Sequence, residues 1–274
     1  MEYIIKKTET TESNLKKYSH LLSQVFSNTN KFTLKFLEWQ YKENPLGLVE
    51  GFDAFYQDEL VGHYVTIPVS YIYDGEKKKG LLSLNTAIHN KHRGKGLFTK
   101  LALETYKEAE KNGFEFVVGV ANENSTHGFI KKLGFELISP LEVKFGVGKM
   151  KSKLDSKYRF KPFWDLESLK WRLNCPNKEY NQNSNIVFAK TTTFGIRAQL
   201  YQNYLSKLSL PKFSLLFNIW IGIDENKIKK GILINLPEVF KPSPLNFIFK
   251  NLSSNMFDIK KTDIYFELID FDAY

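Results

Sequence analysis

The sequence is poor in cysteine and in long apolar runs. Cys175 is the single cysteine of 274 residues, so an internal disulfide is excluded and no cysteine cluster offers a metal site. No apolar run approaches the ~18 residues of a membrane span. The first residues, MEYIIKKTETTES, lack the apolar centre of a secretory signal. These absences predict a cytosolic protein that uses no metal.

The composition is that of a globular protein with a basic excess. Hydrophobic residues make up 42% and charged residues 25%, which is typical of a folded soluble chain. The formal net charge of +9 is compatible with nucleic acid, an anionic membrane or a phosphorylated ligand. Much of the excess lies in GKMKSKLDSKYRFK, and we expect residues 148–162 to be a solvated basic linker.

The first half shows a readable order of periodicities. Helical spacing, strand-like runs and turn residues predict a strand, two helices, three antiparallel strands, a helix, a strand, a short helix and a strand. The expected positions, in that order, are 3–8, 13–27, 33–45, 51–57, 60–73, 80–89, 98–113, 114–121, a helix from 124 or 125 to 134, and 135–138. This order predicts an α/β (α+β) fold whose mixed, mostly antiparallel sheet is flanked by helices.

The second half repeats this pattern weakly. SLKWRLNCPNKEY (168–180) echoes FLEWQYKENPLGL (36–48), and strand-like runs follow each. We therefore expect a domain at 1–147 and a degenerate copy, or an accessory α/β lobe, at 163–274. In this alignment PEVFKPSPLNF (237–247) stands in place of NKHRGKGLFTK (90–100), and a helix is possible in SPLNFIFKNL.

The stretch HNKHRGKGLFTKLALE predicts an anion site. It places a basic loop with two glycines between a strand and a helix, where backbone N–H groups without helical partners point outward. Gly94 and Gly96 allow an oxyanion to approach the backbone closely, and Arg93 and Lys95 add positive charge. The spacing fits neither a Walker loop nor a dinucleotide fingerprint, whose third glycine is replaced by Thr99. The simpler alternative is a tight strand-to-helix turn.

Two segments resemble the GNAT superfamily of acetyl-CoA-dependent N-acyltransferases. TAIHNKHRGKGLF is similar to its acetyl-CoA loop, Arg/Gln-x-x-Gly-x-Gly/Ala, although Phe98 replaces the final small residue. ANENSTHGFIKKLGF, residues 121–135, resembles the segment in which an asparagine contacts the coenzyme. The resemblance implies a GNAT fold, with the second half as a possible tandem lobe, and acetyl-CoA as co-substrate.

The resemblance also implies a set of site residues. The strands at 83–88 and 117–120 would separate, the loop N–H groups would hold the coenzyme diphosphate, and the N–H near Ile88 would polarise the thioester carbonyl. The expected coenzyme-binding residues are Ala87, Ile88, Arg93, Gly94, Lys95, Gly96, Leu97, Phe98, Asn122 and Asn124, and the expected catalytic residues are Ile88 and His127.

The chain departs from the family pattern at Ile130. Many members carry a tyrosine there that protonates the leaving thiolate, and by this resemblance Ile130 would point toward the thioester sulfur. His127, one turn earlier, is the candidate substitute acid, although it also fits a helix-cap or exposed position. The candidate bases are His63, His89 and Glu38, although His63 also fits a buried core position.

These features predict transfer of an acetyl or other acyl group from acyl-CoA to a primary amine by direct attack, with an amino sugar as the leading acceptor. One alternative is an aminoacyl-tRNA-dependent transferase of the peptidoglycan-bridge type, which the positive charge would suit. The other is a non-catalytic CoA-binding module, which Ile130 would suit. Apart from tRNA, nucleic acid is not expected as a partner.

Overall fold

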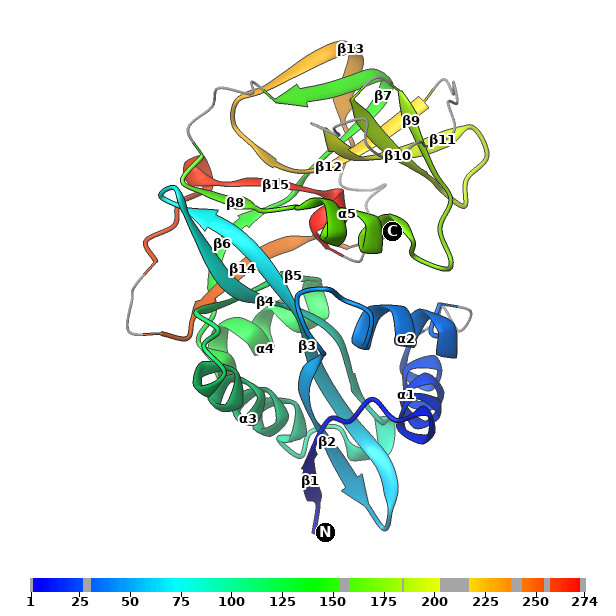
Figure 1. Cartoon of the computed structure of the whole chain (residues 1–274), viewed down its shortest axis with the longest axis vertical. Helices are drawn as coiled ribbons and strands as arrows, with labels where there is room; N and C mark the ends of the chain where they lie inside the picture. The colour runs from blue at the N-terminus through cyan, green and yellow to red at the C-terminus, as the bar shows by residue number, and fades with distance from the viewer. Residues whose placement is uncertain are drawn as a thin grey trace.

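The computed structural model describes residues 2–26, 31–152, 158–183, 185–202, 217–237, 243–253 and 257–271. It contains two β-sheets, one built mainly from the first half of the chain and one mainly from the second (Figure 1). None of the helices in these ranges combines the length and the apolar character needed to cross a bilayer.

The first sheet is mixed and mostly antiparallel, as predicted. Its strands follow the order β1 (Ile4–Lys7), β2 (Glu50–Tyr56), β3 (Glu59–Tyr73), β4 (Glu76–Ile88), β5 (Phe116–Ala121), β14 (Asn246–Asn251) and β6 (Glu136–Pro140), and β8 (Phe160–Pro162) pairs with β3. The neighbours β4 and β5 are parallel, whereas the other pairs of this sheet are antiparallel.

Helices cover both faces of this sheet. The helices α1 (Glu12–Val25) and α2 (Leu34–Tyr41) pack on one face, and α3 (Leu97–Lys111) and α4 (Glu123–Leu133) pack on the other (Figure 1). Short polar side chains cap the starts of α1, α2 and α4, and glycines with positive φ follow α3 and end α4. All four helices lie where the sequence predicted them.

The second sheet has the same pattern of parallel and antiparallel neighbours as the first sheet, but it has fewer strands. Its order is β13 (Lys227–Asn235), β7 (Glu142–Ser152), β12 (Phe217–Asp224), β11 (Ile196–Gln202), β10 (Ile186–Lys190) and β9 (Tyr180–Asn183), with β15 (Tyr265–Glu267) paired to β12. Here β11 and β12 are the parallel neighbours, as β4 and β5 are in the first sheet.

The two halves exchange one strand each. Strand β7 leaves the first half and lies between β12 and β13, while β14 comes from the second half and lies between β5 and β6. Residues 148–152, expected to begin a solvated linker, therefore continue a central strand, and residues 153–157 lie outside the described residues. The helix considered for SPLNFIFKNL is wrong, because residues 246–251 form β14.

The topology also changes the internal alignment. Since β11 and β12 correspond to β4 and β5, the counterpart of the basic glycine loop falls after β11, at 203–216, which lies outside the described residues. The segment 237–247 leads into β14 instead. No helix intervenes between β12 and β13 because residues 225 and 226 turn directly from one strand into the other.

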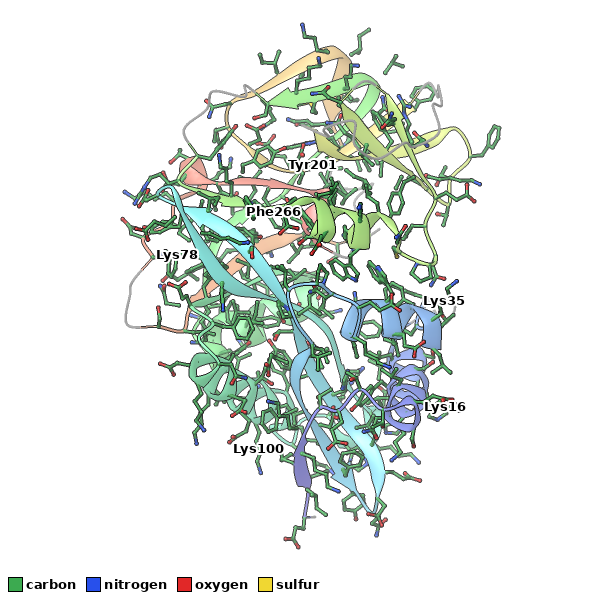
Figure 2. The ribbon with its side chains drawn as sticks, viewed as in Figure 1. Lys16, Lys35, Lys78, Lys100, Tyr201 and Phe266 are labelled. Atoms are coloured by element: carbon green, nitrogen blue, oxygen red, sulfur yellow. The ribbon has the colours of Figure 1, made fainter. Side chains whose placement is uncertain are left out.

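Two tryptophans join the halves. Trp39 of α2 stacks on Trp171 of α5 (Leu166–Leu173), with ring centroids 4.9 Å apart and an interplanar angle of 17°. Each indole Nε1 donates to the backbone oxygen of the other tryptophan at 2.8 Å. The contact is reciprocal and joins the two Leu-x-Trp segments that the sequence paired. Figure 2 shows the labelled Phe266 and Tyr201 within the second half, and Lys16 and Lys35 extending from α1 and α2 into solvent.

Candidate active site

A pocket of about 540 Å³ opens where β4 and β5 separate. The last paired residues of these strands are Ser83 and Gly119, and beyond this point the two strands diverge. The pocket is lined by Val25 and Phe26 of the α1 end, by residues 83–86 and 88 of β4, by the basic loop and the start of α3, by β5 and α4, and by Ile248 of β14. The separation of these strands agrees with the sequence expectation.

The register of β3 and β4 directs a backbone donor into this opening. The His89 N–H donates to the Val61 oxygen at 2.9 Å, and Gly62 lies opposite Ile88. In an antiparallel pair alternate residues turn their N–H groups to opposite sides, so the Ile88 N–H points away from β3. Ile88 also lines the pocket, which places this N–H where an oxyanion-type donor would be needed.

The start of α3 forms the second wall. Gly96 is its N-cap, with φ 75° in the left-handed region, and the first helical bond that it receives comes from the Lys100 N–H at 3.0 Å. The N–H groups of Leu97, Phe98 and Thr99 therefore precede regular helical bonding, and all three residues line the pocket. A Cβ built on Gly94 or Gly96 would meet no atom within 4 Å, so both glycines border open space.

Positive charge gathers at this wall. Arg93 and Lys95 are exposed in the loop, and Lys132 of α4 lines the pocket from the opposite side. Burial and the nearby Lys95 lower the pKa of His92, which also lines the pocket. Cationic side chains beside the start of a helix provide the positive electrostatic environment that an anion needs.

Helix α4 forms the third wall, and two expectations fail there. The helix begins at Glu123 rather than at the expected 124 or 125. Its N-cap is Asn122, whose side chain accepts from the Ser125 N–H at 3.0 Å. Asn122, Asn124 and His127 line the pocket. Ile130 does not appear among the described lining residues because it packs partly buried against the apolar cluster under α3 and α4. The expectation that Ile130 points at the sulfur is therefore wrong.

Most other predicted residues also lie at the pocket. Ile88, Arg93, Gly94, Gly96, Leu97 and Phe98 line it. The Ala87 side chain is 1% exposed and packs in the core, and the Lys95 side chain is exposed on the loop, so neither contributes to the described lining.

The candidate bases are dispersed. Glu38 pairs with Lys42 on the surface of α2 at 3.5 Å, and His89 accepts from the Lys91 N–H at 3.4 Å. His63 is fully buried, with its Nδ1 2.6 Å from the Asp53 Oδ1. None of these three side chains lies among the described lining residues.

The sequence analysis missed Asn85, which lines the pocket from β4. It lies in a β-bulge with φ 47°, because His63 pairs with Ala87 while Val65 pairs with Leu84. Its Nδ2 donates to the Gln40 Oε1 at 2.6 Å and to the Tyr41 hydroxyl at 3.0 Å. An asparagine inside an apolar strand run is disfavoured, and this was the signal available in SLNTAI.

A sheet that opens between two parallel strands, with a glycine loop and a helix start at the opening, defines the class of GNAT acyltransferases. The model of the GNAT acetyltransferase domain matches residues 7–138, slightly less than half of the chain, and this stretch is similar to that domain. No curated protein matches the chain in sequence.

Solved structures share the fold over most of the chain. A probable N-acyltransferase from Enterococcus faecalis is similar with a TM-score of 0.60 and 11% identity, over 92% of this chain and 73% of that one. A putative acetyltransferase from Pyrococcus horikoshii gives 0.55 and 12%, over 96% and 92%. The N-myristoyltransferase of Saccharomyces cerevisiae, solved with myristoyl-CoA, gives 0.52 and 11%, over 73% and 65%.

Proposed function

We propose that this protein transfers an acetyl group from acetyl-CoA to a primary amine by direct attack. The observation that carries the proposal is the opening between β4 and β5, which joins the Ile88 N–H to the uncapped start of α3. The separated strand edges suit the amide groups of the pantetheine arm. The first-turn N–H groups of α3, with Arg93 and Lys95, suit the diphosphate.

The reaction then needs few protein groups. The amine nitrogen attacks the thioester carbon, and the Ile88 N–H stabilises the oxyanion that forms. When the tetrahedral intermediate collapses, the C–S bond breaks and the sulfur leaves as a thiolate. A free thiol has a pKa near ~8.5, so the thiolate is a tolerable leaving group, and His127 at the pocket wall is the proposed proton donor to it. The amine loses its surplus proton to solvent or to a basic group.

An amino sugar is the proposed acceptor. Ser83, Asn85 and Thr86 provide polar groups along β4, while Val25 and Phe26 provide an apolar surface at the end of α1. This combination suits a ring that carries hydroxyl groups on an apolar body.

The test is release of free thiol from acetyl-CoA in the presence of glucosamine, spermidine, a lysine peptide or an arylamine. We expect turnover with at least one amine and none with glucose, which lacks the nucleophile. Binding of CoA by the protein, with acetyl-CoA left intact in the presence of every amine, would instead indicate a non-catalytic module. A salt-sensitive complex with tRNA and no CoA binding would favour the aminoacyl-tRNA alternative.

A further inference from the structure

A buried chain of polar side chains runs from the interior of the first half to the pocket. Its inner end is Asp53 of β2, which is 1% exposed. The Asp53 carboxylate accepts hydrogen bonds from the Tyr18 hydroxyl at 2.7 Å, from the Thr8 hydroxyl at 3.2 Å and from the His63 Nδ1 at 2.6 Å. The Asp53 carboxyl group is therefore the acceptor end of this chain.

The direction of each later hydrogen bond follows from this end. Because Asp53 accepts, the His63 Nδ1 carries a hydrogen, and in the neutral ring the Nε2 is then an acceptor. The Tyr41 hydroxyl lies 3.0 Å from that Nε2, so it donates to His63. Its oxygen is left to accept from Asn85 at 3.0 Å.

This order fixes the Asn85 amide. Its Nδ2 faces inward, because it donates to the Tyr41 hydroxyl and to the Gln40 Oε1. The two bonds use both hydrogens of the amide nitrogen. The bulge and the left-handed backbone of Asn85 hold the residue at the pocket wall.

We propose that Asn85 is a substrate-binding residue whose Oδ1 accepts a hydrogen bond from the N–H of the acceptor amine, and that Tyr41, His63 and Asp53 are positioning residues that keep this oxygen turned toward the pocket. This rests on the proposed function, since it names the group that receives the amine. A carbonyl oxygen at this point favours an incoming donor and holds the nitrogen lone pair free for attack. An acceptor that presents only hydrogen-bond acceptors is disfavoured there, because it would face an oxygen.

The kinetic test uses the full chain with the best amine of the panel and acetyl-CoA. Asn85→Ala removes the oxygen and should raise the KM for the amine about tenfold, the effect of one lost hydrogen bond, while the KM for acetyl-CoA stays within about twofold. Tyr41→Phe keeps the ring but releases the Asn85 amide, and should raise the amine KM about threefold. Tyr106→Phe is the matched control: it removes another buried tyrosine hydroxyl, bonded to Tyr64 at 2.5 Å, and should change neither KM.

A second measurement tests the directions of the hydrogen bonds in the chain, and it needs no variant. In the protein labelled with ¹⁵N-histidine, the His63 resonances should show Nδ1 protonated and Nε2 unprotonated at neutral pH. The opposite tautomer would overturn the positioning chain even if Tyr41→Phe failed to fold. Wild-type turnover with an unchanged amine KM in Asn85→Ala would overturn the Asn85 assignment alone. Absence of wild-type turnover with every amine would overturn the proposed function, and the assignment with it.

Discussion

Gly96 combines a left-handed backbone with open space beside its Cα. Valine at this position adopts φ 75° only with strain, at about 1–2 kcal/mol, and its side chain would extend toward the first-turn N–H groups of α3. We expect Gly96→Val to abolish CoA binding in calorimetry while the protein stays folded. Arg93→Ala should weaken binding by at most about 1.5–3 kcal/mol because it removes one charge-assisted contact.

Gly75 offers a matched control for this prediction. It has φ 88° in the turn between β3 and β4, a Cβ there would also meet no atom within 4 Å, and it does not belong to the pocket lining. Gly75→Val should therefore lower the melting temperature by a similar amount and leave CoA affinity unchanged. If both variants lost affinity equally, backbone strain rather than obstruction of the phosphate would be the cause.

Asp270 makes stability depend on pH. Burial raises the pKa of this carboxyl to about 7, although Glu267 and Trp164 donate to it. In the unfolded chain the pKa is near ~3.9, so between these values the folded state binds more protons than the unfolded state. The favourable contribution is complete below pH ~4 and is lost as the pH rises through about 7.

We therefore expect the free energy of unfolding to fall between pH 5 and pH 8, in part through Asp270. Asp270→Asn carries no titrating proton and should flatten this part of the pH dependence, whatever its effect on absolute stability. Urea denaturation at several pH values measures both slopes. Parallel slopes for the two proteins would show that the carboxyl does not titrate in this range.

At the scale of elements, α2 and α5 are coupled through Trp39 and Trp171. Trp171→Leu removes the stacking and the donor to the Trp39 oxygen, which should lower the free energy of unfolding by about 2–4 kcal/mol. Trp39→Leu should behave similarly. Each hydrogen bond ends on a backbone oxygen, which survives the substitution of the other tryptophan. The free energies lost with the two hydrogen bonds should therefore add in the double variant, whereas the stacking energy is lost only once.

The double variant should thus lose about 0.5–1.5 kcal/mol less than the sum of the single variants, which is the range for an aromatic pair. Chemical denaturation of the four proteins gives this coupling directly. Strict additivity would mean that the stacked geometry contributes nothing beyond the burial of each ring.

Elements with a clear period were predictable from sequence, and elements defined by distant partners were not. Amphipathic spacing and caps located the helices α1 to α4, and alternation located β2 and β3. Strand β14 was read as a possible helix because Phe247, Ile248 and Phe249 are all buried, and a strand covered on both faces has no alternation to read. The exchange of β7 for β14 depends on strand pairing between the two halves of the chain. No local sequence pattern predicts such pairing.

The same division applies to the site. The glycine loop at the pocket was predictable because its glycines, cations and helix start are contiguous in sequence. Asn85 was missed because its partners, Gln40 and Tyr41, come from α2, and Tyr41 is in turn bonded to β3 and β2 through His63 and Asp53. A polar residue in β4 acquires its role only when these elements meet. Ile130 was misplaced because the family motif fixes its position in α4 but not the face that packs against the core.

For the whole molecule, the exchanged strands predict that neither half folds alone. A fragment of residues 1–147 lacks β14, so β5 and β6 would each lose their shared neighbour and the apolar surface of β7 would lack its sheet. We expect this fragment to aggregate and to bind no CoA. Co-expression of residues 1–152 with residues 158–274 should restore a soluble complex that binds CoA, and a soluble, CoA-binding 1–147 fragment would contradict the prediction.

The position of Ile248 has a consequence for synthesis on the ribosome. Among the residues that the structure describes, every other one that lines the pocket lies between Val25 and Lys132, whereas Ile248 arrives with β14. During translation the growing chain therefore carries its loop, its helices and an unfinished sheet edge well before the strand that closes the edge has emerged. Through that interval β5 and β6 present unpaired backbone groups to other nascent chains, which makes this stage the one at which a chaperone would be needed most.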